Sequence, residues 1–151
     1  MILDDALKIA TAQAFTDTGG GQVTGSSIDL GNTTVIRDIA AGKPMCLLFQ
    51  VTVAAAGSTD TFILKVVDDD NSSLTSPAVL SQRGVLKAAL TAGSLHVLVI
   101  PPGVISQRYL GGYVAVGSSD TVTMSCWVAG LEDIREYDRF YPTGIRMDYV
   151  S

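Results

Sequence analysis

Short apolar and β-branched segments, separated by Gly, Ser, Asp and Pro, constrain the fold of this chain more than any other feature. Segments of this kind are typical of β-strands, and the residues between them are those that favour turns. The stretches 55–60 and 117–120 are typical of hairpin loops, and Pro101 and Pro102 end the segment before them because neither can donate a ladder hydrogen bond. Five segments are expected strands: 46–54, 60–68, 94–101, 108–117 and 121–130.

Several of these strands carry apolar residues on both faces. In "FILKVV", Phe62, Leu64 and Val66 share one face, and the opposite face, from Ile63 to Val67, is also mostly apolar. A strand exposed to water on one side would alternate more strictly. Both sides of several strands are therefore expected to be covered, by a second sheet or by a neighbouring subunit.

Further segments complete the expected fold. Residues 25–31 and 33–39 are expected edge strands, and 77–86 is a further candidate strand. Residues 3–15 have an acidic start and a helical face, and they predict a helix, an edge strand or an extended arm. About seven or eight short strands in a chain of 151 residues predict an all-β fold, a β-sandwich or jelly roll.

The chain is long enough for one domain with its own hydrophobic core. We expect an N-terminal arm over residues 1–18, a β-sandwich domain over 19–131 and an extended C-terminal tail over 132–151. Only 17% of the residues are charged, while Gly, Ser, Thr and Ala are abundant. A surface of this composition indicates that partners cover part of it.

Charge and cysteine usage exclude several classes of partner. A net charge of −5 and a sequence pI near 4.6 argue against nucleic acid, which needs a cationic patch. No apolar run approaches the roughly 20 residues of a membrane span, and no secretory signal peptide is recognisable. Cys46 and Cys126 both lie inside apolar segments, so we expect two buried, reduced thiols.

The sequence offers little for catalysis or for binding a cofactor. The single histidine, His96, lies in mid-strand and is expected to be structural, and two distant cysteines do not make a zinc site. The Gly-rich stretch 16–25 matches no phosphate-binding motif and is expected to be a loop or arm. Asp68–Asn71 could offer oxygens to Ca²⁺, but the same residues equally form an exposed turn. We therefore expect no enzyme and no cofactor.

The two ends of the chain are the candidate contact regions. The tail combines aromatic and arginine side chains, which dominate the energetics of protein interfaces. It is expected either to clasp a partner or a sister subunit, or to fold back over its own sandwich. The candidate contacts of the tail are Arg135, Tyr137, Arg139, Phe140, Tyr141, Arg146 and Tyr149. Those of the N-terminal arm are Ile2, Leu3, Asp4 and Leu7.

Several segments, in their order along the chain, resemble the capsid cement (decoration) proteins of short-tailed bacteriophages. They are "MILD" (1–4), "IDLG" (28–31), "RDIAAGKP" (37–44), "SPAVL" (76–80) and "PPGVISQRYLGGYVAV" (101–116). The family pattern "RYLRL" reads Arg108-Tyr109-Leu110-Gly111-Gly112 here, which puts a flexible or closely packed step in that strand. The tail after Gly130 is also longer than the family pattern, so the resemblance implies nothing about its role.

The resemblance implies a β-sandwich or jelly-roll module on the outer surface of the virion, made in the host cytoplasm. Such a protein bridges neighbouring copies of the major capsid protein as a symmetric oligomer, and a dimer and a trimer both fit this sequence. No nucleic acid and no membrane are expected as partners. The alternative is a carbohydrate- or receptor-binding β-sandwich of a virion, for which Trp127, Tyr109 and Tyr113 are the available aromatic residues.

Overall fold

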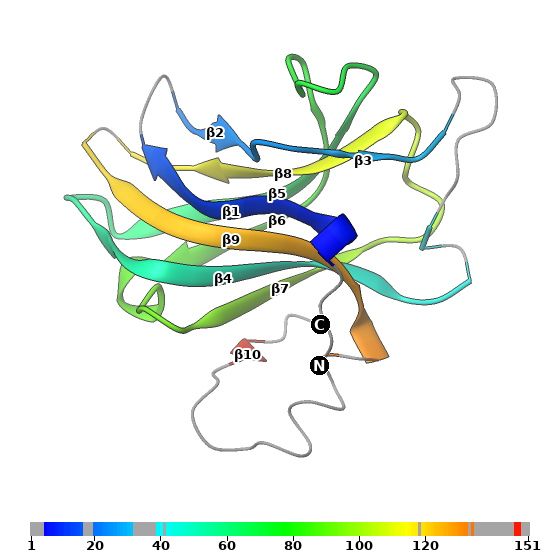
Figure 1. Ribbon diagram of the computed structural model, residues 1–151. Coiled ribbons are helices and arrows are strands. Elements are labelled where there is room, and N and C mark those ends of the chain that lie inside the picture. Colours follow the sequence, from blue (N-terminus) through cyan, green and yellow to red (C-terminus); the bar gives the residue numbers. More distant parts are fainter. Residues whose placement is uncertain are drawn as a thin grey trace.

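The computed structural model describes residues 5–16, 20–31, 39–40, 42–117, 119–132, 134 and 147–148. Two β-sheets pack face to face in these residues (Figure 1). Sheet A has the order β1-β9-β4-β7-β10, and sheet B has the order β2-β8-β5-β6, with β3 also paired to β8. The strands of sheet A are β1 (Lys8–Thr16), β4 (Met45–Ala56), β7 (Leu95–Ile100), β9 (Thr121–Gly130) and β10 (Met147–Asp148). Those of sheet B are β2 (Gln22–Val23), β3 (Ile28–Asp29), β5 (Thr61–Asp69), β6 (Ala78–Leu86) and β8 (Tyr109–Ala115).

The pairing of the strands has the nested order of a jelly roll. The hairpin β5–β6 lies innermost in the sequence, and around it β4 pairs with β7, β2 and β3 pair with β8, and β1 pairs with β9. All of these pairs are antiparallel, and they are distributed between two sheets as in double-sheet jelly rolls. The predicted all-β sandwich or jelly roll is confirmed.

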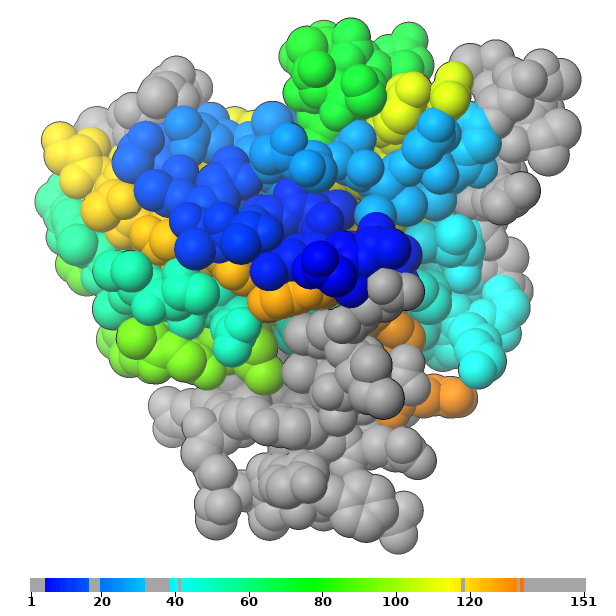
Figure 2. Space-filling model, in the orientation of Figure 1, coloured from blue at the N-terminus to red at the C-terminus, as the bar shows by residue number. Residues whose placement is uncertain are grey.

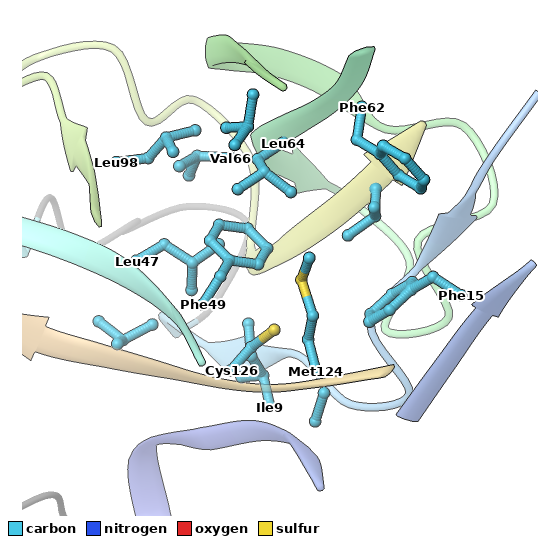
Figure 3. Packing of buried hydrophobic residues seen from close by; sticks show 14 of the residues in the cluster. Ile9, Phe15, Leu47, Phe49, Phe62, Leu64, Val66, Leu98, Met124 and Cys126 are labelled. Carbon is cyan, nitrogen blue, oxygen red and sulfur yellow. The ribbon is translucent and has the colours of Figure 1, made fainter. Parts of the chain in front are cut away.

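The core lies between the two sheets and comes from strict alternation along the strands. Leu47 and Phe49 of β4 and Leu64 and Val66 of β5 are fully buried, at 0% exposure. In Figure 3, Leu47 and Phe49 lie between Leu64 and Val66 on one side and Met124 and Cys126 on the other. The alternation read from "FILKVV" thus gives the inner face of β5.

Most of the N-terminal region is a strand of the sandwich. Residues 8–16 form β1, which pairs with β9 at the edge of sheet A, and an edge strand was one of the three structures expected for residues 3–15. A 3-10 turn at Asp5–Leu7 directly precedes β1. The two register shifts in β1 and the positive φ of Ala12 (42°) interrupt the strand pattern, which explains why the sequence also fitted a helix.

Other differences are local. The Gly-rich stretch expected as a loop or arm contains β2, whose Gln22 and Val23 pair with Val114 and Tyr113. Of the expected edge strand 33–39, residues 33–38 lie outside the described part. A second 3-10 turn, Lys87–Ala89, follows β6. Among the described residues, no helix has the length and apolar character needed to cross a membrane.

Candidate partner-binding surface

The outward side of sheet A carries a second apolar cluster, separate from the core. Along β4, Leu47 and Phe49 point into the sandwich, so Cys46 and Leu48 point away from it, and both are 0% exposed. Residues of β7 and β9 and of the chain just after β9 join them. This outer cluster consists of Cys46, Leu48, Leu95, Val97, Trp127, Ala129, Leu131 and Ile134.

The C-terminal part of the chain starts within this cluster. Leu131 directly follows β9, its N–H donates to the carbonyl oxygen of Pro44 at 2.9 Å, and Ile134 is 0% exposed. Further along, β10 pairs in parallel with Leu95 and His96 of β7 (Figure 1). The outer cluster therefore lies beside the β7 edge of sheet A, where the chain adds its own strand β10. Addition of an extended segment to a sheet edge is also a recognised mode of peptide binding.

Toward the start of β9, the outward side of sheet A carries hydroxyl side chains. The Thr52 hydroxyl donates to the carbonyl oxygen of Thr123 at 3.2 Å, and the Ser125 hydroxyl accepts from the N–H of Ala12 at 2.8 Å. Figure 2 shows β1, β9, β4 and β7 as one continuous surface. Sheet A thus presents an apolar end at the start of β4 and a Ser/Thr-rich end at the start of β9.

A cation lies over each of the three aromatic rings that the sequence offered for sugar binding. The Lys8 ammonium is 5.2 Å from the centroid of Trp127, the Lys65 ammonium 4.9 Å from that of Tyr113, and the Arg108 guanidinium 5.0 Å from that of Tyr109. Such contacts stabilise the fold by cation–π attraction. They also occupy ring faces on which a sugar would stack.

The acidic loop after β5 is held by its own backbone. The Asp68 carboxylate accepts from the N–H groups of Ser106 and Gln107 at 2.8 and 2.9 Å, which fixes the loop before β8. Asp69 accepts from the N–H groups of Asn71 and Ser76 at 3.1 and 2.8 Å. Asp68 and Asp69 are thus buried residues at the end of β5, at 0% and 1% exposure, and only Asp70 and Asn71 lie in the exposed turn that the sequence suggested. In the described residues, no three His, Cys, Asp or Glu side chains are grouped to hold a metal ion.

Burial and hydrogen bonding act in opposite directions on Asp69. Desolvation, the largest influence, works to raise the pKa of Asp69, but the hydrogen bonds from Ser76 and Asn71 favour the charged form and together lower it. Asp69 is thus a buried, charged anchor of the β5–β6 loop. The buried His96 ring lies with Nε2 3.2 Å from the Ser94 hydroxyl, and both side chains lie inside the protein.

Most of the contact residues expected from the sequence lie outside the described part of the chain. These are Arg135, Tyr137, Arg139, Phe140, Tyr141, Arg146, Tyr149, Ile2, Leu3 and Asp4. Leu7 is described: it is half-buried and packs against the core, so it is part of the sandwich rather than an exposed arm contact. The outer cluster was not predicted from the sequence. The pattern that gives rise to it, strands with apolar residues on both faces, was recognised there.

Taken together, these features define a small all-β jelly-roll sandwich. Its described polar clusters are structural, and its distinctive feature is a buried apolar cluster on the outward side of sheet A, beside a sheet edge. The chain belongs to the Bbp16 family, whose model matches residues 9–127. The matched region runs from β1 into β9 and ends at Trp127, before the segment that starts at Leu131. Among curated proteins, none matches the chain.

Proposed function

We propose that this protein is a phage capsid cement: it binds the outer surface of the head, bridges neighbouring copies of the major capsid protein and stabilises the shell. Its place is then the outside of the virion, after synthesis in the host cytoplasm. It acts through its interfaces alone, without catalysis and without a cofactor. It works with the coat and with further copies of itself, as a dimer or a trimer.

The observation that carries this proposal is the outer cluster. A jelly roll needs one core, between its sheets, and in this protein that core is already complete with residues such as Phe49 and Leu64. The outer cluster is a second apolar group on the side of sheet A that faces away from the core. Its residues are only 0% to 9% exposed, so this face of sheet A is covered, as a sheet face is when a chain segment or a partner packs on it. A module whose task is to hold neighbours together needs such a surface.

The composition and the sequence resemblance support the same function. The segments that resemble cement proteins include parts of β3 and β8, which pair in sheet B. A cement that binds assembled coat but not free coat adds its binding free energy to the stability of the shell by linkage. This role requires a stable body and contact surfaces, which are the features that the sandwich offers.

The carbohydrate-binding alternative has less support. Trp127 is 9% exposed and lies under Lys8, and the rings of Tyr113 and Tyr109 each carry a cation on one face. A sugar platform needs an open aromatic face. A glycan array would detect such binding directly, and a strong, specific signal there would replace the cement by the alternative.

The test of the proposal is co-sedimentation with three forms of a candidate phage coat protein: expanded capsids, unexpanded procapsids and free subunits. The full-length chain is compared with a variant ending at residue 131. Selective binding of the full-length chain to expanded capsids is expected. Loss of this binding in the truncated variant would assign the contact to residues 132–151, and its retention would assign it to the sandwich. No binding of the full-length chain to any form would refute the cement function.

A further inference from the structure

The outward side of sheet B forms a second exposed surface, on the opposite side of the molecule from the outer cluster. In the pairing of β5 with β6 and β8, Ile63 lies opposite Gly84 and Ala115, and Lys65 lies opposite Gln82 and Tyr113. Residues directly opposite each other in an antiparallel pair project to the same side of the sheet. The sheet B face comprises Thr61, Ile63, Lys65, Gln82, Gly84, Leu86, Tyr113 and Ala115.

This face is open and carries two exposed aliphatic side chains. Ile63 is 36% exposed and Leu86 is 63% exposed, whereas Phe62 and Leu64, which alternate with Ile63 along β5, are 0% exposed. Gly84 and Ala115 contribute almost no side chain, so the surface between the larger residues is flat. Flat patches with exposed aliphatic and aromatic residues are typical of protein contacts.

A hollow borders the face at Tyr113. It has a volume of about 360 Å³ and is lined by Gln13, Gly21, Gln22, Val23 and Tyr113. Gly21 has φ +141°, and a Cβ at this position would lie 2.7 Å from Cε1 of Tyr113, so only glycine keeps this wall in place. The hollow is shallow and open to solvent, so it gives the edge of the face relief against which a partner surface can fit.

The charge of the face differs from that of the whole chain. Lys65 is its only charged member, in a protein with a net charge of −5. Its ammonium lies 4.9 Å from the Tyr113 ring centroid, beside the hollow. The complementary partner surface is therefore apolar, with a carboxylate placed to meet Lys65.

The size of the face decides between a second copy and a larger assembly as the partner. Thr61 to Lys65 covers about 17 Å along the strands and about 14 Å across three of them, or roughly 240 Å². A specific interface buries about 800 Å² on each partner. The face is thus too small to hold two copies together by itself. It suits a contact that acts together with another contact of the same molecule. Two linked contacts bind with a higher overall avidity than either contact alone.

We propose that the sheet B face is a second docking surface for the coat, and that it receives an apolar patch with a carboxylate on a neighbouring coat subunit. This inference rests on the cement function proposed above and gives it a geometry. The sandwich contacts one subunit through the outer side of sheet A and the next through the sheet B face. Bridging follows because the two surfaces lie on opposite sides of one rigid body.

The test measures the affinity of full-length variants for expanded capsids by quantitative co-sedimentation. Lys65→Glu reverses the charge, and the double variant I63S/L86S removes the exposed apolar side chains. Val104→Ser is the matched control, because Val104 is 39% exposed but lies in the loop between β7 and β8, outside both sheets. Thermal melting confirms that each variant folds. Both face variants are expected to bind roughly tenfold more weakly, and the control within about twofold of the unmodified chain.

Any other result would contradict a specific part of the proposal. Unchanged binding of both face variants would overturn the docking role of the face and leave the cement function standing. Equal weakening in the Val104 control would overturn it as well, since any exposed apolar residue would then matter. Self-association of the unmodified chain that the face variants abolish would assign the face to a second copy. Failure of the unmodified chain to bind any coat form would refute the cement function itself.

Discussion

Asp29 and Arg108 form a two-point ion pair between β3 and β8. The Arg108 Nε donates to Oδ1 of Asp29 at 2.8 Å, and Nη2 donates to Oδ2 at 2.7 Å. The backbone adds a third bond, from the N–H of Leu30 to the carbonyl oxygen of Arg108 at 2.8 Å. The two residues belong to "IDLG" and "RYLGG", two of the segments that resemble cement proteins. The structure therefore gives these segments a shared role: they hold the short strand β3 against β8.

This ion pair predicts a specific dependence of stability on pH. The hydrogen bonds from the Arg108 side chain and then from the N–H of Gly31 lower the pKa of Asp29 from 3.8 to about 2. The contribution of Asp29 to stability is therefore present above its unfolded pKa and is lost as the pH falls from about 4 through about 2. Urea unfolding of the unmodified protein and of Asp29→Asn should show a difference at neutral pH that vanishes in this window. The difference is small, since the pair is partly exposed, and it should shrink in high salt. A difference independent of pH would contradict the ion pair as its cause.

Gly112 is a close-packed position in β8. A Cβ there would lie 3.0 Å from Cδ2 of Leu47 and 3.0 Å from Cγ2 of Thr24, tighter than ordinary contacts. Gly112→Ala is therefore expected to destabilise the protein by roughly 1–3 kcal/mol through overpacking. Gly42→Ala is the control, because a Cβ at Gly42 meets nothing within 4 Å, and it should be close to neutral. Chemical denaturation of both variants gives the comparison, and equal stabilities would refute the packing argument.

Asp120 joins the loop before β5 to the loop before β9, and Gly57 makes room for it. The Asp120 carboxylate accepts from the N–H of Ser58 at 2.7 Å and of Thr59 at 3.2 Å. Gly57 has φ +121°, and a Cβ at this position would collide with Asp120. Gly57→Ala is expected to cost roughly 1–3 kcal/mol of stability through backbone strain and this collision.

The pKa of Asp120 provides a test of its bonds to the loop before β5. The Thr59 hydroxyl, followed by backbone N–H groups, lowers the pKa of Asp120 despite its burial. Asp120→Asn should therefore lower the melting temperature at neutral pH and less so in acid, where the native carboxylate also becomes protonated. Melting curves of both proteins from neutral to acidic pH test this expectation. A melting temperature equal to that of the unmodified protein at neutral pH would contradict the anchoring role.

The sequence predicted the central strands because their alternation is regular over enough residues. Phe62, Leu64 and Val66 were placed on one face by period alone, and their burial confirms it. The alternation in β1 is broken by its two register shifts, so its place in sheet A depends on its pairing with β9. β2 has only two residues, too few for any pattern, and is defined by distant partners in β8. The apolar character of both strand faces was recognisable, but which end of sheet A would gather the outer cluster depends on how β4, β7 and β9 align.

The two cysteines are expected to be unreactive in the folded protein. Cys46 lies in the outer cluster and Cys126 in the core, so they face opposite sides of sheet A and form no disulfide. Burial raises the pKa of the Cys126 thiol, which removes the reactive thiolate. Maleimide labelling followed by mass spectrometry should find no modification in native conditions and modification of both residues in denaturant. Labelling of Cys46 alone in the native state would mean that the outer cluster opens to solvent.

Leu47 and Leu48 are adjacent residues of β4, both 0% exposed, that point into different apolar clusters. Either substitution by Ala should cost roughly 2–5 kcal/mol, because each leaves a cavity in a closed apolar environment. The two should respond differently to removal of residues 135–151. Ile134 lies in the outer cluster and β10 pairs with β7 beside it, so truncation is expected to reduce the cost of Leu48→Ala and to leave that of Leu47→Ala unchanged. Denaturation of six proteins forms two double-mutant cycles: the unmodified chain, the truncated chain, the two single variants, and each single variant with the truncation. Coupling of Leu48 alone to the truncation would identify the C-terminal segment as the cover of the outer cluster in the free protein. Absence of coupling would mean that this segment leaves the surface available to a partner.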